Sequence, residues 1–346
     1  MLFFNANFIC YYFYPTKKRE EPIILIITKT PLRISFTGGG TDLAAYYENG
    51  YGAVVSTSID KYIYITINKR FDDTIRVSYS QTEIVNSVDE LKHEIARACL
   101  KMVGITGGVE ITSIADIPSG TGLGSSSSFT VGLLNALYTY IGERLSAEEL
   151  AERACQIEID ILNHPIGKQD QYAAAFGGIN YFSFERGGAV KRDKIVLNAN
   201  ELRNMDRKLM MFYTGMRRSA DGILERQKKE AKDKMQVLDF MRNQANEMKS
   251  YLQHKGFDQS FAEMLDAAWQ KKKTVTTGIS NNEIDELYGK SREAGAAGGK
   301  LLGAGGGGFI LLYCDEQYQD AVREAIGLRE LDFHVSTYGS RVVYFE

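Results

Sequence analysis

The sequence predicts an α+β fold in two domains. Helix and strand patterns alternate irregularly along 346 residues, a length for which two domains of ordinary size are expected. Hydrophobic residues make up 44% of the chain and charged residues 25%, as in folded globular proteins. The 33 glycines gather in a few clusters between these patterns, so the clusters are the first candidates for binding loops.

The overall charge excludes some classes of function. The 41 Lys and Arg and the 44 Asp and Glu give a net charge of −3, which provides no general attraction for nucleic acid or an anionic membrane. No run approaches the roughly 18 apolar residues of a membrane span. We therefore expect a cytoplasmic protein with no nucleic-acid partner and no membrane partner. The sequence leaves the oligomeric state open, and a homo-oligomer is compatible with it.

Strand patterns dominate the first hundred residues. Apolar and polar residues alternate in the second half of the stretch 23–36, which predicts a half-buried strand with Arg33 on the face away from the core. Further strands are expected over residues 53–68, 74–79 and 109–112. A helix is expected near residues 88–103.

Two amphipathic helices follow a glycine-serine cluster. Apolar residues recur at helical spacing over residues 129–141. Ser146 and Glu149 form a capping-box pattern that opens a second helix, which reaches about residue 162. A shorter helix over residues 171–176 and a strand that runs to residue 184 complete the N-terminal half.

The C-terminal half is mainly helical. Helices are expected over residues 224–253, 261–273, 282–294 and 317–326, and strands over 309–313 and 335–345. We place an N-terminal extension outside the core at residues 1–27 and two domains at residues 28–197 and 198–346.

A phosphate-binding loop is predicted at residues 118–128, which read PSGTGLGSSSS. Three alternating glycines allow the backbone to approach a ligand closely, and the helix that follows offers unpaired amides and a positive dipole end. The Walker pattern is absent, so a P-loop fold is disfavoured.

A second glycine cluster, residues 300–309, formally contains GxGxxG. A dinucleotide-binding fingerprint opens a helix, whereas this cluster leads into an apolar strand, so the context excludes that interpretation. Taken alone, the cluster is equally compatible with a tight connection.

These motifs resemble those of the GHMP kinases, the family of galactokinase, homoserine kinase and mevalonate kinase. The resemblance rests on residues 31–43 (PLRISFTGGGTDL), 118–128 and 302–309 (LGAGGGGF), in the family's order, and covers about residues 28–346. It implies a two-domain GHMP kinase fold, with an N-terminal domain like ribosomal protein S5 domain 2, a ferredoxin-like C-terminal domain and ATP between them.

The resemblance also implies roles for individual residues. Asp170 matches the catalytic aspartate, and Arg33 matches a basic residue that would hold the transferred phosphoryl group. Ser126 and Glu158 would bind Mg²⁺. The residues expected to bind ATP are Pro118, Gly120, Gly122, Leu123, Gly124, Ser125, Ser126 and Ser127.

The acceptor site departs from that of galactokinase, which carries a glutamate and a histidine where this sequence has Gly39 and Gly40. The loss of these groups makes room for a larger or phosphorylated sugar, while Asp42 remains for hydroxyls. The residues expected to bind substrate are Gly39, Gly40, Thr41, Asp42, Lys168, Arg217, Arg218 and Gly305, with the cations available for a distal phosphate.

Within the family the motif set looks most like that of the heptose 7-phosphate kinases. The expected reaction is therefore ATP-dependent phosphorylation of the anomeric hydroxyl of a heptose 7-phosphate, with ATP and Mg²⁺ as cofactors and a sugar phosphate as the partner. One alternative is L-fucose kinase or another sugar-1-kinase. An alternative of a different class is a non-catalytic sensor that binds sugar and ATP.

Overall fold

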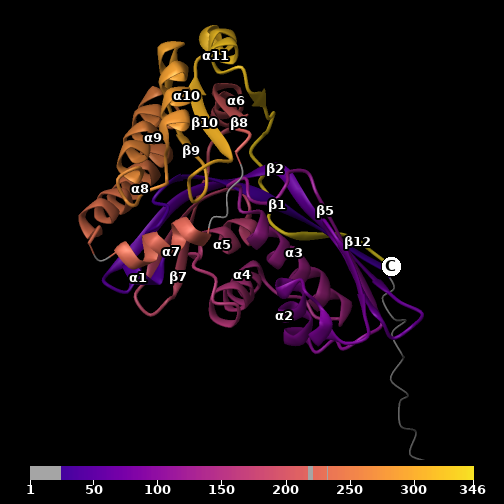
Figure 1. The fold of residues 1–346 in the computed structure, drawn as a ribbon. Coiled ribbons are helices and arrows are strands. Elements are labelled where there is room, and N and C mark those ends of the chain that lie inside the picture. The colour runs from indigo at the N-terminus through magenta and orange to yellow at the C-terminus, as the bar shows by residue number, and fades with distance from the viewer. Residues whose placement is uncertain (1–24, 217–220, 232) are drawn as a thin grey trace, which may run out of the picture.

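The structure is a computed structural model that describes residues 25–216, 221–231 and 233–346. It confirms the α+β class, with one large sheet in the N-terminal half and a four-stranded sheet in the C-terminal half (Figure 1). In these three stretches no helix combines the length and the apolar character that crossing a membrane requires.

The large sheet has eight strands in the order β12-β1-β2-β5-β3-β4, and β2 also pairs with β6, which pairs with β7. The pairing of β3 with β5 is parallel, and the others are antiparallel. Its strands are β1 (Leu25–Thr37), β2 (Tyr51–Lys69), β3 (Ile75–Ser78), β4 (Thr82–Val85), β5 (Val109–Ala115), β6 (Ile179–Glu185), β7 (Val190–Ile195) and β12 (Arg341–Phe345).

Helices of the N-terminal half lie along one side of this sheet (Figure 1). They are α1 (Ala44–Tyr47), α2 (Glu94–Val103), α3 (Ser125–Tyr140), α4 (Ala147–Cys155) and α5 (Gln169–Phe176), with a 3-10 turn at Val88–Glu90. The predicted capping box of Ser146 and Glu149 is confirmed at the start of α4. The helix predicted to continue to residue 162 changes at its end into a π-helical turn, η2 (Gln156–Ile161).

The four-stranded sheet has the order β11-β8-β10-β9. Numbered along the chain this is the 4-1-3-2 order of a ferredoxin-like domain, which confirms that expectation. The strands are β8 (Leu209–Tyr213), β9 (Ala296–Leu301), β10 (Phe309–Cys314) and β11 (Arg329–Glu330). The helices are α6 (Ala199–Lys208), α7 (Asp221–Glu230), α8 (Met235–His254), α9 (Gln259–Lys272), α10 (Asn282–Glu293) and α11 (Gln319–Ile326), with a 3-10 turn at Glu316–Tyr318.

The end of β1 is held between the two domains. Helices α3 and α5 contact β1, and so do α8 and α9 of the C-terminal half. Lys300 Nζ on β9 donates hydrogen bonds of 2.8 Å to the carbonyl oxygens of both Ser35 and Phe36. The rings of Phe36 and Phe261 meet edge to face with centroids 5.1 Å apart. This packing fixes the strand that carries Arg33.

Two parts of the expected domain division differ from the structure. Residues 25–27 form the start of β1, and Ile26 is fully buried there, so they belong to the sheet and not to the expected extension. Residues 1–24 lie outside the described residues. The terminal strand β12 pairs with β1, with Phe345 opposite Ile26, although it was assigned to the second domain. Because β1 pairs with β2 on its other side, β12 covers what would otherwise be an open edge of the sheet.

Candidate functional site

A cavity of about 370 Å³ lies where the two domains meet. Its wall includes β1, the glycine turn after it, the segment before α3, η2, α5, α7, the end of α9 and the loop before β10. The predicted site residues that line it are Arg33, Gly39, Gly40, Asp42, Gly120, Gly122, Gly124, Ser125, Ser126, Ser127, Glu158 and Asp170. Gly303 and Ala304 of the third glycine motif line it too, so residues from all three motifs are brought to one site.

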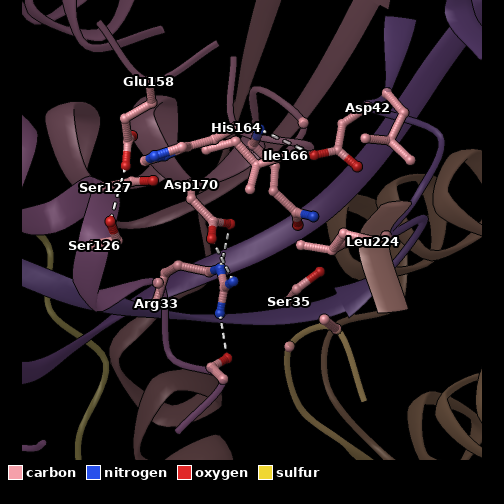
Figure 2. Close-up of a pocket in the computed structure, with 18 of the residues that line it drawn as sticks. Arg33, Ser35, Asp42, Ser126, Ser127, Glu158, His164, Ile166, Asp170 and Leu224 are labelled. Atoms are coloured by element: carbon pink, nitrogen blue, oxygen red, sulfur yellow. Dashed lines mark hydrogen bonds and ion pairs between the residues drawn. The ribbon is translucent and has the colours of Figure 1, made fainter. Parts of the chain in front are cut away.

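Arg33 and Asp170 form a bidentate ion pair at the centre of this site. Arg33 Nε and Nη2 each donate to a different carboxylate oxygen of Asp170, both at 2.7 Å, and Nη1 donates to the carbonyl oxygen of Gly122 at 2.7 Å. Arg33 is only 4% exposed because α5 and the segment before α3 cover its face of β1. In Figure 2 the pair lies between Ser126 and Glu158 on one side and Asp42 on the other.

The predicted phosphate loop has the backbone that its glycines suggest. Gly120, Gly122 and Gly124 all have positive φ, between 73° and 85°. Helix α3 begins directly after Gly124, whose lack of a side chain leaves the first amides of the helix uncapped. Of the residues expected to contact ATP, Pro118 and Leu123 do not line the cavity. The Leu123 side chain is fully buried in the core.

The loop before β10 packs directly on the phosphate loop. A Cβ atom on Gly303 would lie 2.4 Å from Gly122 Cα, and one on Gly308, where φ is +100°, would lie 2.3 Å from the carbonyl oxygen of Thr121. Glycine is therefore required at both positions. Gly303 lines the cavity, whereas Gly305, the residue expected to bind substrate, lies against the backbone of Ile279 and does not.

Glu158 is a fully buried carboxylate that lines the cavity. The π-helical turn η2 places it there, because Leu162 N–H bonds to the carbonyl of Ile157, five residues back. Ser126 Oγ donates to Glu158 Oε1 at 3.0 Å, and Gln171 Nε2 donates to Oε2 at 2.7 Å. Burial raises the pKa of Glu158 above its ordinary value, despite these hydrogen bonds.

Asp42 forms the opposite side of the cavity. Its side chain accepts hydrogen bonds from the backbone N–H groups of Gly40 at 2.9 Å and Gln169 at 3.2 Å. Burial raises its pKa, and the nearby charge of Asp170 raises it further. Thr41, also expected to bind substrate, instead bonds through Oγ1 to the backbone of Ala53 and does not line the cavity.

The cations expected to bind a distal phosphate are placed differently. Lys168 Nζ donates to the carbonyl oxygen of Gly188 at 2.6 Å and lines a smaller neighbouring pocket instead of the main cavity. Arg217 and Arg218 lie outside the described residues.

Sequence reasoning missed several polar residues of the cavity wall. They are Ser35, Glu94, His164, Gln169, Gln227 and Lys272. His164 Nε2 and Glu94 Oε1 are 2.9 Å apart. Lys272 is the second of three consecutive lysines at the end of α9. It follows Leu265 and Trp269 at helical spacing on the buried stripe of that helix, a signal that could have pointed to it. Its position in the cavity depends entirely on the packing of the two domains.

Comparisons with known proteins agree with this fold and site. The family model "GHMP kinases N terminal domain" matches residues 88–178, and "GHMP kinases C terminal" matches residues 248–330. The D-glycero-alpha-D-manno-heptose 7-phosphate kinase of Campylobacter jejuni is 30% identical, over 84% of this chain and 89% of that protein. The chain belongs to the GHMP kinase family.

It is accordingly an ATP-dependent phosphotransferase that acts on an alcohol group. The L-fucokinase/L-fucose-1-P guanylyltransferase of Bacteroides fragilis is 26% identical over 85% of this chain and 35% of its own length. A solved D-glycero-D-manno-heptose 1-phosphate kinase from Bacteroides thetaiotaomicron shares the fold, with a TM-score of 0.77 and 24% identity over 92% of this chain and 99% of that one.

Proposed function

We propose that this kinase transfers the γ-phosphate of ATP to the anomeric C1 hydroxyl of D-glycero-D-manno-heptose 7-phosphate. The product would be the 1,7-bisphosphate, on a route to nucleotide-activated heptose. The observation that carries the proposal is the Arg33–Asp170 pair, which lies between the glycine-rich phosphate loop and the acceptor side around Asp42. The 30% identity to a kinase named for this sugar phosphate supports the substrate.

Asp170 is the proposed catalytic residue that accepts the proton of the acceptor hydroxyl. A carboxylate has about four lone-pair positions, and Arg33 occupies one on each oxygen, so a further lone pair remains for the hydroxyl. An anomeric hydroxyl is more acidic than an ordinary alcohol, which lowers the barrier to this proton transfer. The bidentate contact also fixes the plane of the carboxylate.

Arg33 has a second proposed role toward the transferred group. Phosphoryl transfer depends mainly on positioning and on stabilising the charge that spreads over the moving phosphoryl oxygens. The guanidinium bridges Asp170 and the carbonyl of Gly122, so its charge lies at the junction between the acceptor and the phosphate loop. The amides at the start of α3 would bind the remaining phosphates.

The residues at the start of α3 and in η2 fit a magnesium ion. Ser126 Oγ and Glu158 Oε1 are adjacent hard oxygen donors facing the cavity, and Mg²⁺ is commonly held by one or two carboxylates together with substrate phosphates. Across the described ranges no group of three or more His, Cys, Asp or Glu forms a metal site, so most ligands would come from ATP and water. Bound Mg²⁺ would neutralise the phosphates.

L-fucose kinase is the second candidate, because the Bacteroides fragilis protein is 26% identical over most of this chain. A non-catalytic sensor is disfavoured, since such a protein would need the glycine loops but not the ion pair of Arg33 and Asp170 that lines the cavity.

The test is a substrate panel with purified protein, ATP and Mg²⁺, read as ADP release. Heptose 7-phosphate should have the highest kcat/KM, and phosphorus NMR should show the new phosphate on C1. Faster turnover of L-fucose would overturn the substrate assignment but leave the kinase assignment standing.

A further inference from the structure

The acceptor side of the cavity contains a buried cation with no acidic partner. Lys272 is 6% exposed and lines the cavity. Its Nζ donates one hydrogen bond, to the carbonyl oxygen of Gly303 at 2.6 Å, and no carboxylate in the described part of the chain lies within ion-pair distance of it. An ammonium group has three donors, so two remain available to a ligand.

Three further polar groups of the same wall are also unsatisfied. Ser35 Oγ, Gln169 Oε1 and Gln227 Nε2 are buried and have no hydrogen-bond partner among residues 25–216, 221–231 and 233–346. Each belongs to a residue that lines the cavity. An unpaired buried polar atom is unfavourable, so a ligand whose polar groups pair with these three atoms would fit this cavity.

Gly39 lies where the side chains of Lys272, Ser35 and Gln169 approach one another. A Cβ atom built on Gly39 would lie 3.5 Å from Lys272 Nζ, 3.6 Å from Ser35 Oγ and 3.7 Å from Gln169 Nε2. The three side chains therefore surround one small space, which exists because residue 39 has no side chain.

The electrostatics of this space favour an anion. Burial lowers the pKa of Lys272 to about 8, and the charge of Arg33 contributes to the lowering, whereas Asp42 and Asp170 act in the opposite direction. Arg33 is already paired with Asp170. The desolvation of the ammonium is therefore only partly compensated, and an anionic group bound to it would offset the remaining cost.

We propose that Lys272, Ser35, Gln169 and Gln227 recognise the acceptor and that Lys272 binds its anionic group, so that the enzyme selects a phosphorylated sugar over the neutral one. The remaining hydroxyls of the sugar would pair with the unsatisfied oxygen and nitrogen atoms. This inference rests on the proposed function, because it assumes a sugar phosphate as acceptor. Lys272 takes the place of Lys168 as the proposed phosphate-binding cation, because the ammonium of Lys168 donates to the carbonyl oxygen of Gly188.

The test compares Lys272→Met with Lys273→Met. The control changes the next lysine of the same chain segment, which pairs with Asp285 and does not line the cavity. KM and kcat are measured for ATP, for heptose 7-phosphate and for the same heptose without its phosphate. In Lys272→Met the KM for the phosphorylated sugar should rise at least tenfold, while those for the neutral sugar and ATP stay within twofold. Lys272→Arg should recover part of the loss.

Equal losses for both sugars, or a raised KM for ATP, would overturn the inference, because Lys272 would then act on the transferred phosphoryl group or on the fold. If wild-type enzyme prefers neutral sugars, the proposed function and this inference both fail. If it prefers heptose 7-phosphate and Lys272→Met leaves that KM unchanged, the inference alone fails.

Gly39→Ala keeps the test decisive if Lys272→Met does not fold. Gly39 has no positive φ, and its added methyl would make ordinary van der Waals contacts, so the backbone tolerates the change. The methyl would nevertheless occupy the point of convergence, and the acceptor KM should rise at least fivefold at unchanged ATP KM. An unchanged acceptor KM would refute the placement of the subsite.

Discussion

Replacement of Asp170 by Asn tests the proposed proton acceptor most directly. The amide keeps the shape of the side chain but removes its basicity, so ATP should still bind while kcat falls about 100- to 10,000-fold. This loss corresponds to about 3–5 kcal/mol in the activation barrier.

Asp170→Asn also lowers the stability of the folded protein, and the hydrogen bonds of Arg33 indicate by how much. The amide of the Asp170→Asn variant would retain one oxygen for Arg33, so one of the two charge-assisted hydrogen bonds is lost and the one to the Gly122 carbonyl remains. Such a bond contributes about 1.5–3 kcal/mol, and because the Arg33 side chain left without a carboxylate is only 5% exposed, the loss lies toward the upper end. A protein with about 5–15 kcal/mol of stability should remain folded.

The assay measures kcat at saturating sugar and ATP, ATP affinity by calorimetry, and urea unfolding of the same preparation. Asp160→Asn is the matched control, because this exposed carboxylate on η2 does not line the cavity. A kcat within tenfold of wild type in folded Asp170→Asn protein would refute the assignment of Asp170 as the base.

Four further outcomes follow from the site. Arg33→Ala should lower kcat more than ATP affinity, because the charge of Arg33 is proposed to stabilise the phosphoryl group as it moves. Steady-state kinetics measures kcat, and calorimetry measures the ATP affinity. Ser126→Ala and Glu158→Ala should weaken ATP binding in the presence of Mg²⁺. If the wild-type protein binds ATP equally well with Mg²⁺ and with a chelator, the metal assignment is wrong. Gly308→Val should lower the unfolding midpoint, since φ is +100° and a Cβ would lie 2.3 Å from a backbone oxygen; a wild-type midpoint would contradict this. Burial lowers the pKa of Lys272 to about 8, so its ammonium loses its charge as the pH rises through 8. The acceptor KM should therefore rise above pH 8. In Lys272→Arg this rise should disappear, and a persisting rise would assign it to another group.

Features that depend on neighbouring residues in the chain could be predicted from the sequence. The capping box at Ser146 involves residues only three positions apart. The glycines of the phosphate loop adopt positive φ, a backbone conformation that residues with a side chain disfavour. The family resemblance also implied that Arg33 and Asp170 act in one site, although it says nothing about the geometry of their ion pair.

Features that depend on distant segments could not be predicted in this way. The pairing of β12 with β1 joins residues more than 300 positions apart in the sequence. The π-helical turn that presents Glu158 was not predicted either, because the apolar spacing over residues 146–162 is that of an ordinary helix. The prediction that Arg33 faces away from the core was incomplete, because α5 covers that face and buries it.

The sequence by itself determined the family, the α+β class and the loops that surround the cavity, because these follow from short motifs and local backbone preferences. Only the tertiary structure placed Lys272 against Gly303 and beside Gly39. The physical reason is that burial and the loss of solvent around a charge depend on both domains together. A lysine acquires a lowered pKa and an unsatisfied ammonium group only when the other domain closes over it.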